Sequence, residues 1–174
     1  RFTKIFSLFL FFFVLFSANL YSDIVKKVEV KGNNRISTET IMVFGDISIG
    51  KDYNISEINS LIKKLYNTSF FSNISASIKN NTLNIIVKEN PIIKNISFDG
   101  EKAKKYKEKI IELLSLSESS PFIEGNIKSD INLIKEFYRS LGFYFVKIDA
   151  QIEKLDQNRV NIKYVIGKGD KAKI

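Results

Sequence analysis

Two stretches of this chain, about 70 residues apart, carry the same spacing of apolar residues and glycine, and this repetition constrains the fold more than any other feature. The matching pairs, at a constant offset, are Ile24/Ile92, Val25/Ile93, Val28/Ile96, Val30/Phe98 and Gly32/Gly100. A period of about 70 residues is too long for a solenoid repeat and matches a small domain. We therefore expect two modules in tandem, at residues 23–90 and 91–167, and we interpret residues 168–174 as the start of a truncated third module.

The first module is predicted to begin with a strand and two helices. Residues 24–31 are rich in valine and isoleucine, which favours a strand. Ser37 can cap a short helix that continues to about Phe44. Asn54 and Glu57 have the spacing of a capping box, and the helix that follows carries a single apolar stripe, made of Ile58, Leu61, Ile62 and Leu65.

A hairpin completes the first module, and the second module repeats the order β-α-α-β-β. Residues 74–78 and 83–87 alternate between apolar and polar, and Asn80 and Asn81 between them suit a tight turn because asparagine tolerates positive φ. The second module has helical patterns at residues 103–114 and 127–141, then alternating residues 146–152 and 160–164. The alternation leaves one sheet face polar, so we expect an α+β fold in which two helices cover one face of each three-stranded sheet.

The first 22 residues have the pattern of a secretory signal peptide. Arg1 and Lys4 precede an apolar run at residues 5–16, and small residues follow it. The run is short for a membrane span, which needs about 20 apolar residues. Cleavage after Ser22 or Ala18 fits this pattern, and we expect Ser22 because the first predicted strand starts directly after it; the alternative is an uncleaved anchor extended by Leu20 and Tyr21. With either outcome the remainder of the chain leaves the cytoplasm.

Composition argues against an enzyme. The chain has no cysteine and no histidine, which removes disulfides, the usual zinc ligands and the commonest general base. We expect no catalytic residue, no cofactor and no metal site. The net charge is +8, and the lysines at residues 102–109 are interpreted as a solvated helix face, so no nucleic-acid partner is expected. The segment at residues 167–171 is glycine-rich and basic but lacks the P-loop spacing.

An ordered set of short motifs resembles the first two POTRA domains of the BamA family of outer-membrane assembly factors. The motifs are Val28, Val30, Gly32 and Asn33; then Leu65, Tyr66, Phe70, Phe71 and Ser72; then residues 87–93, followed by Ile96, Phe98 and Gly100. Two residues depart from the family's pattern, because Ser69 stands where glycine is usual and Glu101 stands where asparagine is usual. The resemblance implies two tandem POTRA modules and covers nearly the whole chain after the leader.

The resemblance also implies a location and partners. In that family several such modules lie in the periplasm ahead of a C-terminal β-barrel in the outer membrane, which this sequence does not include. The expected partners are unfolded outer-membrane β-barrel precursors and accessory lipoproteins of the assembly complex. We therefore expect a scaffold or receptor region of an outer-membrane protein, on the periplasmic side.

The expected binding sites are the second strands of the two modules, which the resemblance places at sheet edges. An edge strand offers unpaired N–H and C=O groups to an incoming strand. The residues predicted to bind are Asn73, Ser75, Ser77, Lys79, Lys147, Asp149, Gln151 and Glu153. In the first edge we expect the N–H groups of Ser75 and Ser77 to point outward. The alternative is that both edges are merely solvated and protected by lysines.

Two other functions remain open at this point. One is the POTRA region of a two-partner secretion exporter, which typically has two modules before its barrel. The other, of a different class, is a division-type interaction protein with one POTRA module and an uncleaved anchor. The start of a third module favours the assembly factor over the exporter, and the second repeat argues against the division protein.

Overall fold

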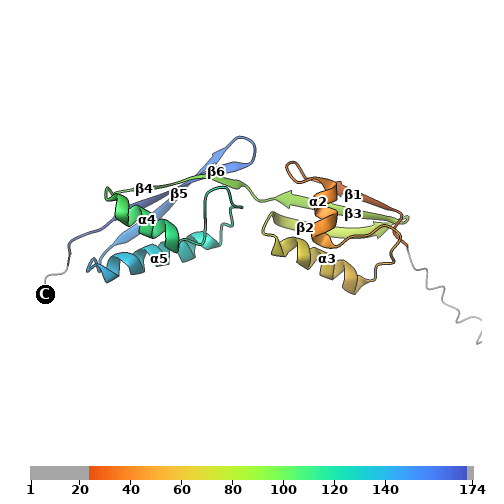
Figure 1. The fold of residues 1–174 in the computed structure, drawn as a ribbon, viewed down its shortest axis with the longest axis horizontal. Coiled ribbons are helices and arrows are strands. Elements are labelled where there is room, and N and C mark those ends of the chain that lie inside the picture. Colours follow the sequence, from red (N-terminus) through yellow and green to blue (C-terminus); the bar gives the residue numbers. More distant parts are fainter. Residues whose placement is uncertain (1–23, 172–174) are drawn as a thin grey trace, which may run out of the picture.

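A computed structural model describes residues 24–171 and contains two separate three-stranded sheets, each with two helices (Figure 1). The first module consists of β1 (Lys27–Lys31), α2 (Thr38–Gly45), α3 (Ile55–Asn67), β2 (Phe71–Lys79) and β3 (Thr82–Glu89). The second consists of β4 (Ile92–Asp99), α4 (Lys104–Leu113), α5 (Asn126–Ser140), β5 (Lys147–Leu155) and β6 (Arg159–Gly167). The predicted α+β class and the order β-α-α-β-β are confirmed.

Both sheets have the same topology, with the last strand of the module in the centre. β3 pairs parallel with β1 and antiparallel with β2, and β6 pairs in the same way with β4 and β5. The strand orders are therefore β1-β3-β2 and β4-β6-β5. As a result β2 and β5 each have a neighbour on one side only, as the resemblance implied.

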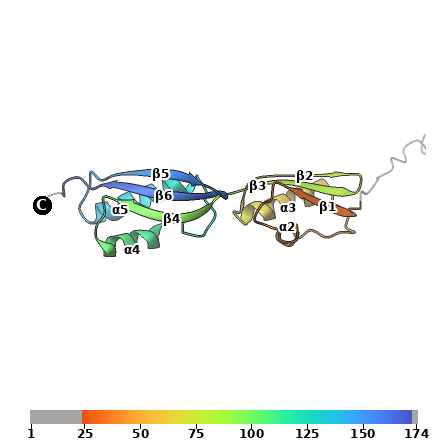
Figure 2. The same cartoon turned by 90° about the horizontal axis from the view of Figure 1, so that it is seen from above.

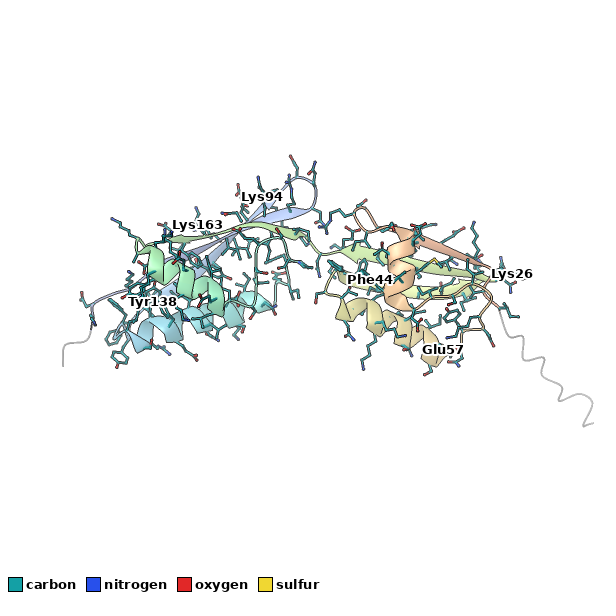
Figure 3. The ribbon with its side chains drawn as sticks, in the orientation of Figure 1. Lys26, Phe44, Glu57, Lys94, Tyr138 and Lys163 are labelled. Carbon is teal, nitrogen blue, oxygen red and sulfur yellow. The ribbon has the colours of Figure 1, made fainter. Side chains whose placement is uncertain are left out.

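Each module has its own hydrophobic core between its sheet and its helices. The first core centres on residues such as Ile41, Leu65 and Leu83, and the second on Ile110, Ile134 and Ile162. Lys94 and Lys163 extend from the opposite, helix-free face of the second sheet, whereas Tyr138 lies on the helix-covered side (Figure 3). The modules lie end to end along the long axis, joined by the short segment between β3 and β4 (Figure 1).

The local signals in the first module correspond to observed contacts. The Ser37 side chain accepts a hydrogen bond from the N–H of Thr40 at the start of α2, and Asn54 and Glu57 form the complete capping box of α3. Asn80 and Asn81 have φ values of 51° and 58°, which defines a type I′ turn. The first strand is shorter than predicted, because it begins at Lys27, and Ile24 forms only an isolated bridge with Asp52.

Some expectations fall wholly or partly beyond the described residues. The predicted signal peptide at residues 1–22 and its cleavage after Ser22 lie outside residues 24–171, as do the last three residues of the predicted third module. Within residues 24–171, no helix combines the length and the apolar character that crossing a membrane requires.

Candidate docking edges

The predicted binding residues all lie on the two edge strands, with their side chains exposed. Asn73, Ser75, Ser77 and Lys79 are on β2, and Lys147, Asp149, Gln151 and Glu153 are on β5. Apart from Asn73, these side chains project from the helix-free face, because the alternate residues of both strands face the helices. Asn73 lies at a bulge, where its side-chain oxygen accepts a hydrogen bond from the Tyr66 hydroxyl of α3 at 3.5 Å. The structure thus brings each group of four together on one strand; their role in binding stays a prediction.

The pairing register shows which backbone groups of β2 face outward. In a two-residue type I′ hairpin the carbonyl of Lys79 faces the N–H of Thr82 across the turn, so the backbone groups of Lys79 point toward β3. Orientation alternates along an antiparallel strand, so Ser75 and Ser77 also pair with β3. The outward groups belong to Ile74, Ala76 and Ile78. The expectation that the N–H groups of Ser75 and Ser77 point outward is therefore wrong.

Two side chains of the chain itself occupy part of these edges. The Tyr66 hydroxyl accepts a hydrogen bond from the N–H of Ile74 at 3.0 Å, which confirms that this N–H does not pair with β3. On β5 the Asp149 carboxylate accepts from the N–H of Ala150 at 2.9 Å, so the outward groups there are those of Ala150 and its alternate neighbours. The Tyr66 hydroxyl is bonded to the N–H of Ile74, two residues before Ala76. It therefore does not occupy the outward N–H of Ala76 at the middle of β2.

A groove runs beside the β2 edge, between this strand and α3. Its volume is about 400 Å³, and its lining includes Tyr53, Ile55, Ile58, Ile62, Ala76 and Ile78. Ile55 is 82 % exposed, so apolar surface is open to solvent at the start of α3. An extended peptide paired with β2 would direct alternate side chains toward this groove.

A larger groove of about 680 Å³ lies between the modules. It is lined at one side by Phe71 and Ser72, at the start of β2, and at the other by Ile152, Lys154 and Leu155, at the end of β5. Tyr66 and Phe122 add aromatic surface, and the charged residues that line the groove are Lys88, Lys154, Arg159, Glu124 and Glu89. The two edge strands therefore meet at a single hollow.

A buried carboxylate anchors the linker to the first module. Glu89 is 4 % exposed and accepts hydrogen bonds from the consecutive N–H groups of Asn34, Arg35 and Ile36, and from the Arg35 guanidinium. Burial raises the pKa of Glu89, but these donors outweigh it and lower the pKa below its ordinary value. The guanidinium also donates to the carbonyl of Asn90 at 2.6 Å, and the side chain of Asn158 donates to the carbonyl of Glu89 at 3.1 Å.

The second module has a related cluster at its far end. Glu101 is 3 % exposed and accepts from the Tyr138 hydroxyl, from the N–H of Ala103 and from Lys168, whose Nζ lies 2.8 Å away. Burial raises the pKa of Glu101, and these donors, with Lys168 foremost, lower it to below its ordinary value. Burial and the neighbouring carboxylate raise the pKa of the Tyr138 hydroxyl, so it stays protonated and donates.

Asp130 fixes the second core in a different way. It is fully buried on α5 and accepts from the N–H groups of Ser115 and Leu116 and from the Tyr164 hydroxyl. These contacts join the loop after α4 to the central strand. Within residues 24–171 no group of three acidic, histidine or cysteine side chains has the geometry of a metal site.

Sequence reasoning missed the roles of Tyr66, Glu89 and Asp130. Tyr66 was identified only as part of a motif, and the two carboxylates carried no spacing signal because their partners lie far away in the chain. Arg35, for example, is 54 residues from Glu89. The one available signal was the departure at Glu101, where a charged residue replaces the usual asparagine at a position that proves to be buried.

Comparison with known proteins supports the resemblance to POTRA domains that the sequence motifs indicate. Residues 91–169 match the family model described as "POTRA: Surface antigen variable number repeat". The chain is 28 % identical over 152 residues to the outer membrane protein assembly factor BamA of Neisseria meningitidis, and 24 % identical over 150 residues to that of Neorickettsia risticii. Each alignment covers 86 % of this chain and 19 % or 20 % of the relative, so the chain spans about a fifth of their length.

A solved structure has the same fold. The N-terminal domain of Omp85 from Thermosynechococcus elongatus superposes with a TM-score of 0.52 at 14 % sequence identity, over 81 % of this chain and 61 % of that one. At this identity the likeness concerns the fold alone.

Proposed function

We propose that this chain, which carries POTRA domains of the kind found in BamA, is the periplasmic receptor region of an outer-membrane protein assembly machinery. In this proposal it binds unfolded outer-membrane β-barrel precursors by adding their extended segments to β2 and β5. Accessory lipoproteins of such an assembly are the second class of partner. The chain acts as a scaffold and performs no catalysis.

The observation that carries the proposal is the pair of one-sided edge strands. β2 and β5 each have nine residues with a paired neighbour on one side only. Unpaired N–H and C=O groups at an edge bind any polypeptide in extended conformation, because they recognise backbone rather than side chains. This property suits a receptor for precursors of varied sequence. The names of the curated relatives favour assembly over the two other functions considered.

The mechanism follows from the edge geometry. An incoming segment pairs with the outward groups of Ala76 and Ile78 on β2, and its alternate side chains enter the groove beside α3. Binding to a single edge is weak, since each hydrogen bond exchanged with water contributes only about 1 kcal/mol. Weak binding allows release of the precursor toward the membrane.

The test places proline where an outward N–H is needed. Ala76→Pro and Ala150→Pro remove that donor, and proline is tolerated at an edge strand whose N–H faces solvent. Ala76→Val and Ala150→Val are matched controls that add similar bulk and keep the N–H. A synthetic peptide of alternating valine and threonine serves as the ligand, and calorimetry measures its affinity. We expect about tenfold weaker binding to the double proline variant and little change with the valine controls.

A second arm of the test changes the peptide instead of the protein. Methylating its backbone nitrogens removes the N–H donors and leaves the side chains unchanged. We expect this peptide to lose affinity for the unmodified protein. Docking by strand addition would be refuted if the unmethylated peptide bound a folded double proline variant as tightly as the unmodified protein, or if methylation left the affinity for the unmodified protein unchanged.

A further inference from the structure

The two docking edges have the same direction and lie on the same side of the molecule. β2 begins near the linker, where Phe71 pairs with Glu89, and runs away from it. β5 runs toward the linker and ends where Leu155 pairs with Arg159, which itself lies opposite Ile92. Because the modules are joined end to end, the end of β5 faces the start of β2, and both strands point the same way along the long axis (Figure 2).

The inter-module groove connects these two ends. Its lining contains the first residues of β2 and the last residues of β5, so both edges open onto the same groove. In Figure 2 the strands β2 and β5 lie along one border of the elongated molecule, whereas β1 and β4 lie along the other, in agreement with the strand orders. Opposite strand directions would have required a client to reverse at the linker.

We infer that β5, the inter-module groove and β2 form one continuous rail, which binds a single extended polypeptide across both modules in one polarity. This inference rests on the proposed function, because it uses the same edges. Each edge strand has nine residues, or about 30 Å at 3.3 Å per residue, so a client of about 20–25 residues reaches both.

The groove adds a chemical preference to the middle of the client. The lysine and arginine side chains that line it are Lys88, Lys154 and Arg159, and the carboxylate of Glu89 is already bound by Arg35 and three N–H groups. Glu124 is the remaining acidic residue in the lining, so the excess charge is positive. The client that fits has alternating apolar residues at both ends and carboxylates between them.

The test compares peptides that differ in polarity. One contains two valine–threonine segments joined head to tail by about six glycine and serine residues, whose r.m.s. span is roughly 13 Å. The other joins the same two segments carboxyl to carboxyl through a diamine spacer of equal length, so their directions oppose. Binding of both to the whole chain is measured by calorimetry, with the single segment as reference.

We expect only the head-to-tail peptide to gain affinity. With an effective concentration on the order of 1 mM and a single-edge Kd near 0.1 mM, the gain is about tenfold. The affinity of the opposed peptide should stay within about twofold of that of the single segment, because carrying two copies of the segment gives only a statistical factor of two. Either Ala76→Pro or Ala150→Pro should return the head-to-tail peptide to the affinity of one segment, and the valine controls should not. Glutamates in the linker should strengthen binding relative to lysines.

The outcomes separate this inference from the function on which it rests. If the double proline variant binds the single segment as well as the unmodified protein does, docking at the edges is refuted and the rail with it. If that variant loses the single segment, but the head-to-tail peptide gains nothing or the opposed peptide gains equally, the edges bind separately and the rail alone is overturned.

Discussion

Replacing Glu89 with glutamine should destabilise the first module far more than a typical surface substitution. The carboxylate accepts from three consecutive backbone N–H groups at 2.8–3.1 Å and from the Arg35 guanidinium at 3.1 Å. Glutamine keeps one acceptor oxygen and presents an NH₂ group to donors. The guanidinium side chain is 31 % exposed, so water can replace its bond, but the N–H groups lose a charged acceptor. We estimate a loss of about 3–5 kcal/mol in the free energy of unfolding.

The stability lost in the Glu89→Gln variant should also depend on pH, which provides a second, independent test. The pKa of Glu89 is lower in the folded state than its ordinary value of 4.5, so its stabilisation is present above that value and is lost as pH falls through the folded pKa. Glutamine has no proton to bind there. The difference in stability between the unmodified protein and Glu89→Gln should therefore shrink as pH falls below 4.5.

The assay must report the two modules separately, because their cores are distinct. Amide hydrogen exchange measured by NMR across a urea series does so, with core amides of β3 and β6 as reporters. Glu29→Gln is the matched control, since its side chain is 38 % exposed, against 1 % for Glu89, and among the described residues its carboxylate bonds only to the exposed Lys27. A loss below about 1 kcal/mol at pH 7, or a difference that does not change with pH, would contradict the role assigned to Glu89.

Three further substitutions test the backbone and the edge. Ser69 has a φ of 61°, where Gly142 in the second module has 92°, so Ser69→Gly should raise the unfolding free energy by about 1 kcal/mol in urea denaturation; a loss would exclude strain at this turn. Gly32→Ala should lower it by more than about 2 kcal/mol, because φ is 85° and the added Cβ would lie 2.0 Å from the carbonyl oxygen of Val87. Tyr66→Phe frees the N–H of Ile74 and should tighten single-segment binding about fivefold in calorimetry; unchanged affinity would show that the hydroxyl does not compete with the client.

Much of the fold could be predicted because its signals are local. The capping box of Asn54 and Glu57 and the turn at Asn80 and Asn81 involve residues within three positions of each other. The alternation along β2 likewise predicted which side chains face solvent. Because the second module repeats the apolar and glycine pattern of the first, the order of its helices and strands could be predicted from the first module.

The orientation of the edge N–H groups was harder to predict, because the direction of a side chain and the direction of the backbone N–H are set separately in a strand. Side chains alternate between the two faces, and backbone groups alternate between the two neighbours, with the same period. The turn that pairs the strands determines whether the residues with core-facing side chains direct their backbone groups toward the partner strand or toward the open edge. In β2 the solvent-facing residues such as Ser75 direct their backbone toward β3, and the core-facing Ala76 directs its backbone outward.

The buried carboxylates were beyond sequence reasoning for a different reason, and they explain the departure at Glu101. Gly32 lies against the carbonyl of Val87 and Gly100 against that of Ile166, so Glu89 and Lys168, two residues further along, occupy equivalent places. Their charges are opposite, and so are those of their partners, Arg35 and Glu101.

Each module thus ties its outgoing chain to the loop after its first strand, but with the acid on opposite sides of the contact. In the first module the central strand supplies the acid, whereas in the second the loop supplies it. A carboxylate at position 168 would face Glu101 at close range, and a lysine at position 89 would leave three N–H groups without an acceptor. The two anchors are therefore not interchangeable, although the modules share one fold. The anchor at Glu89 also reaches the inter-module groove, because Glu89 and Asn90 line it and the Asn158 side chain, which follows β5, donates to the carbonyl of Glu89.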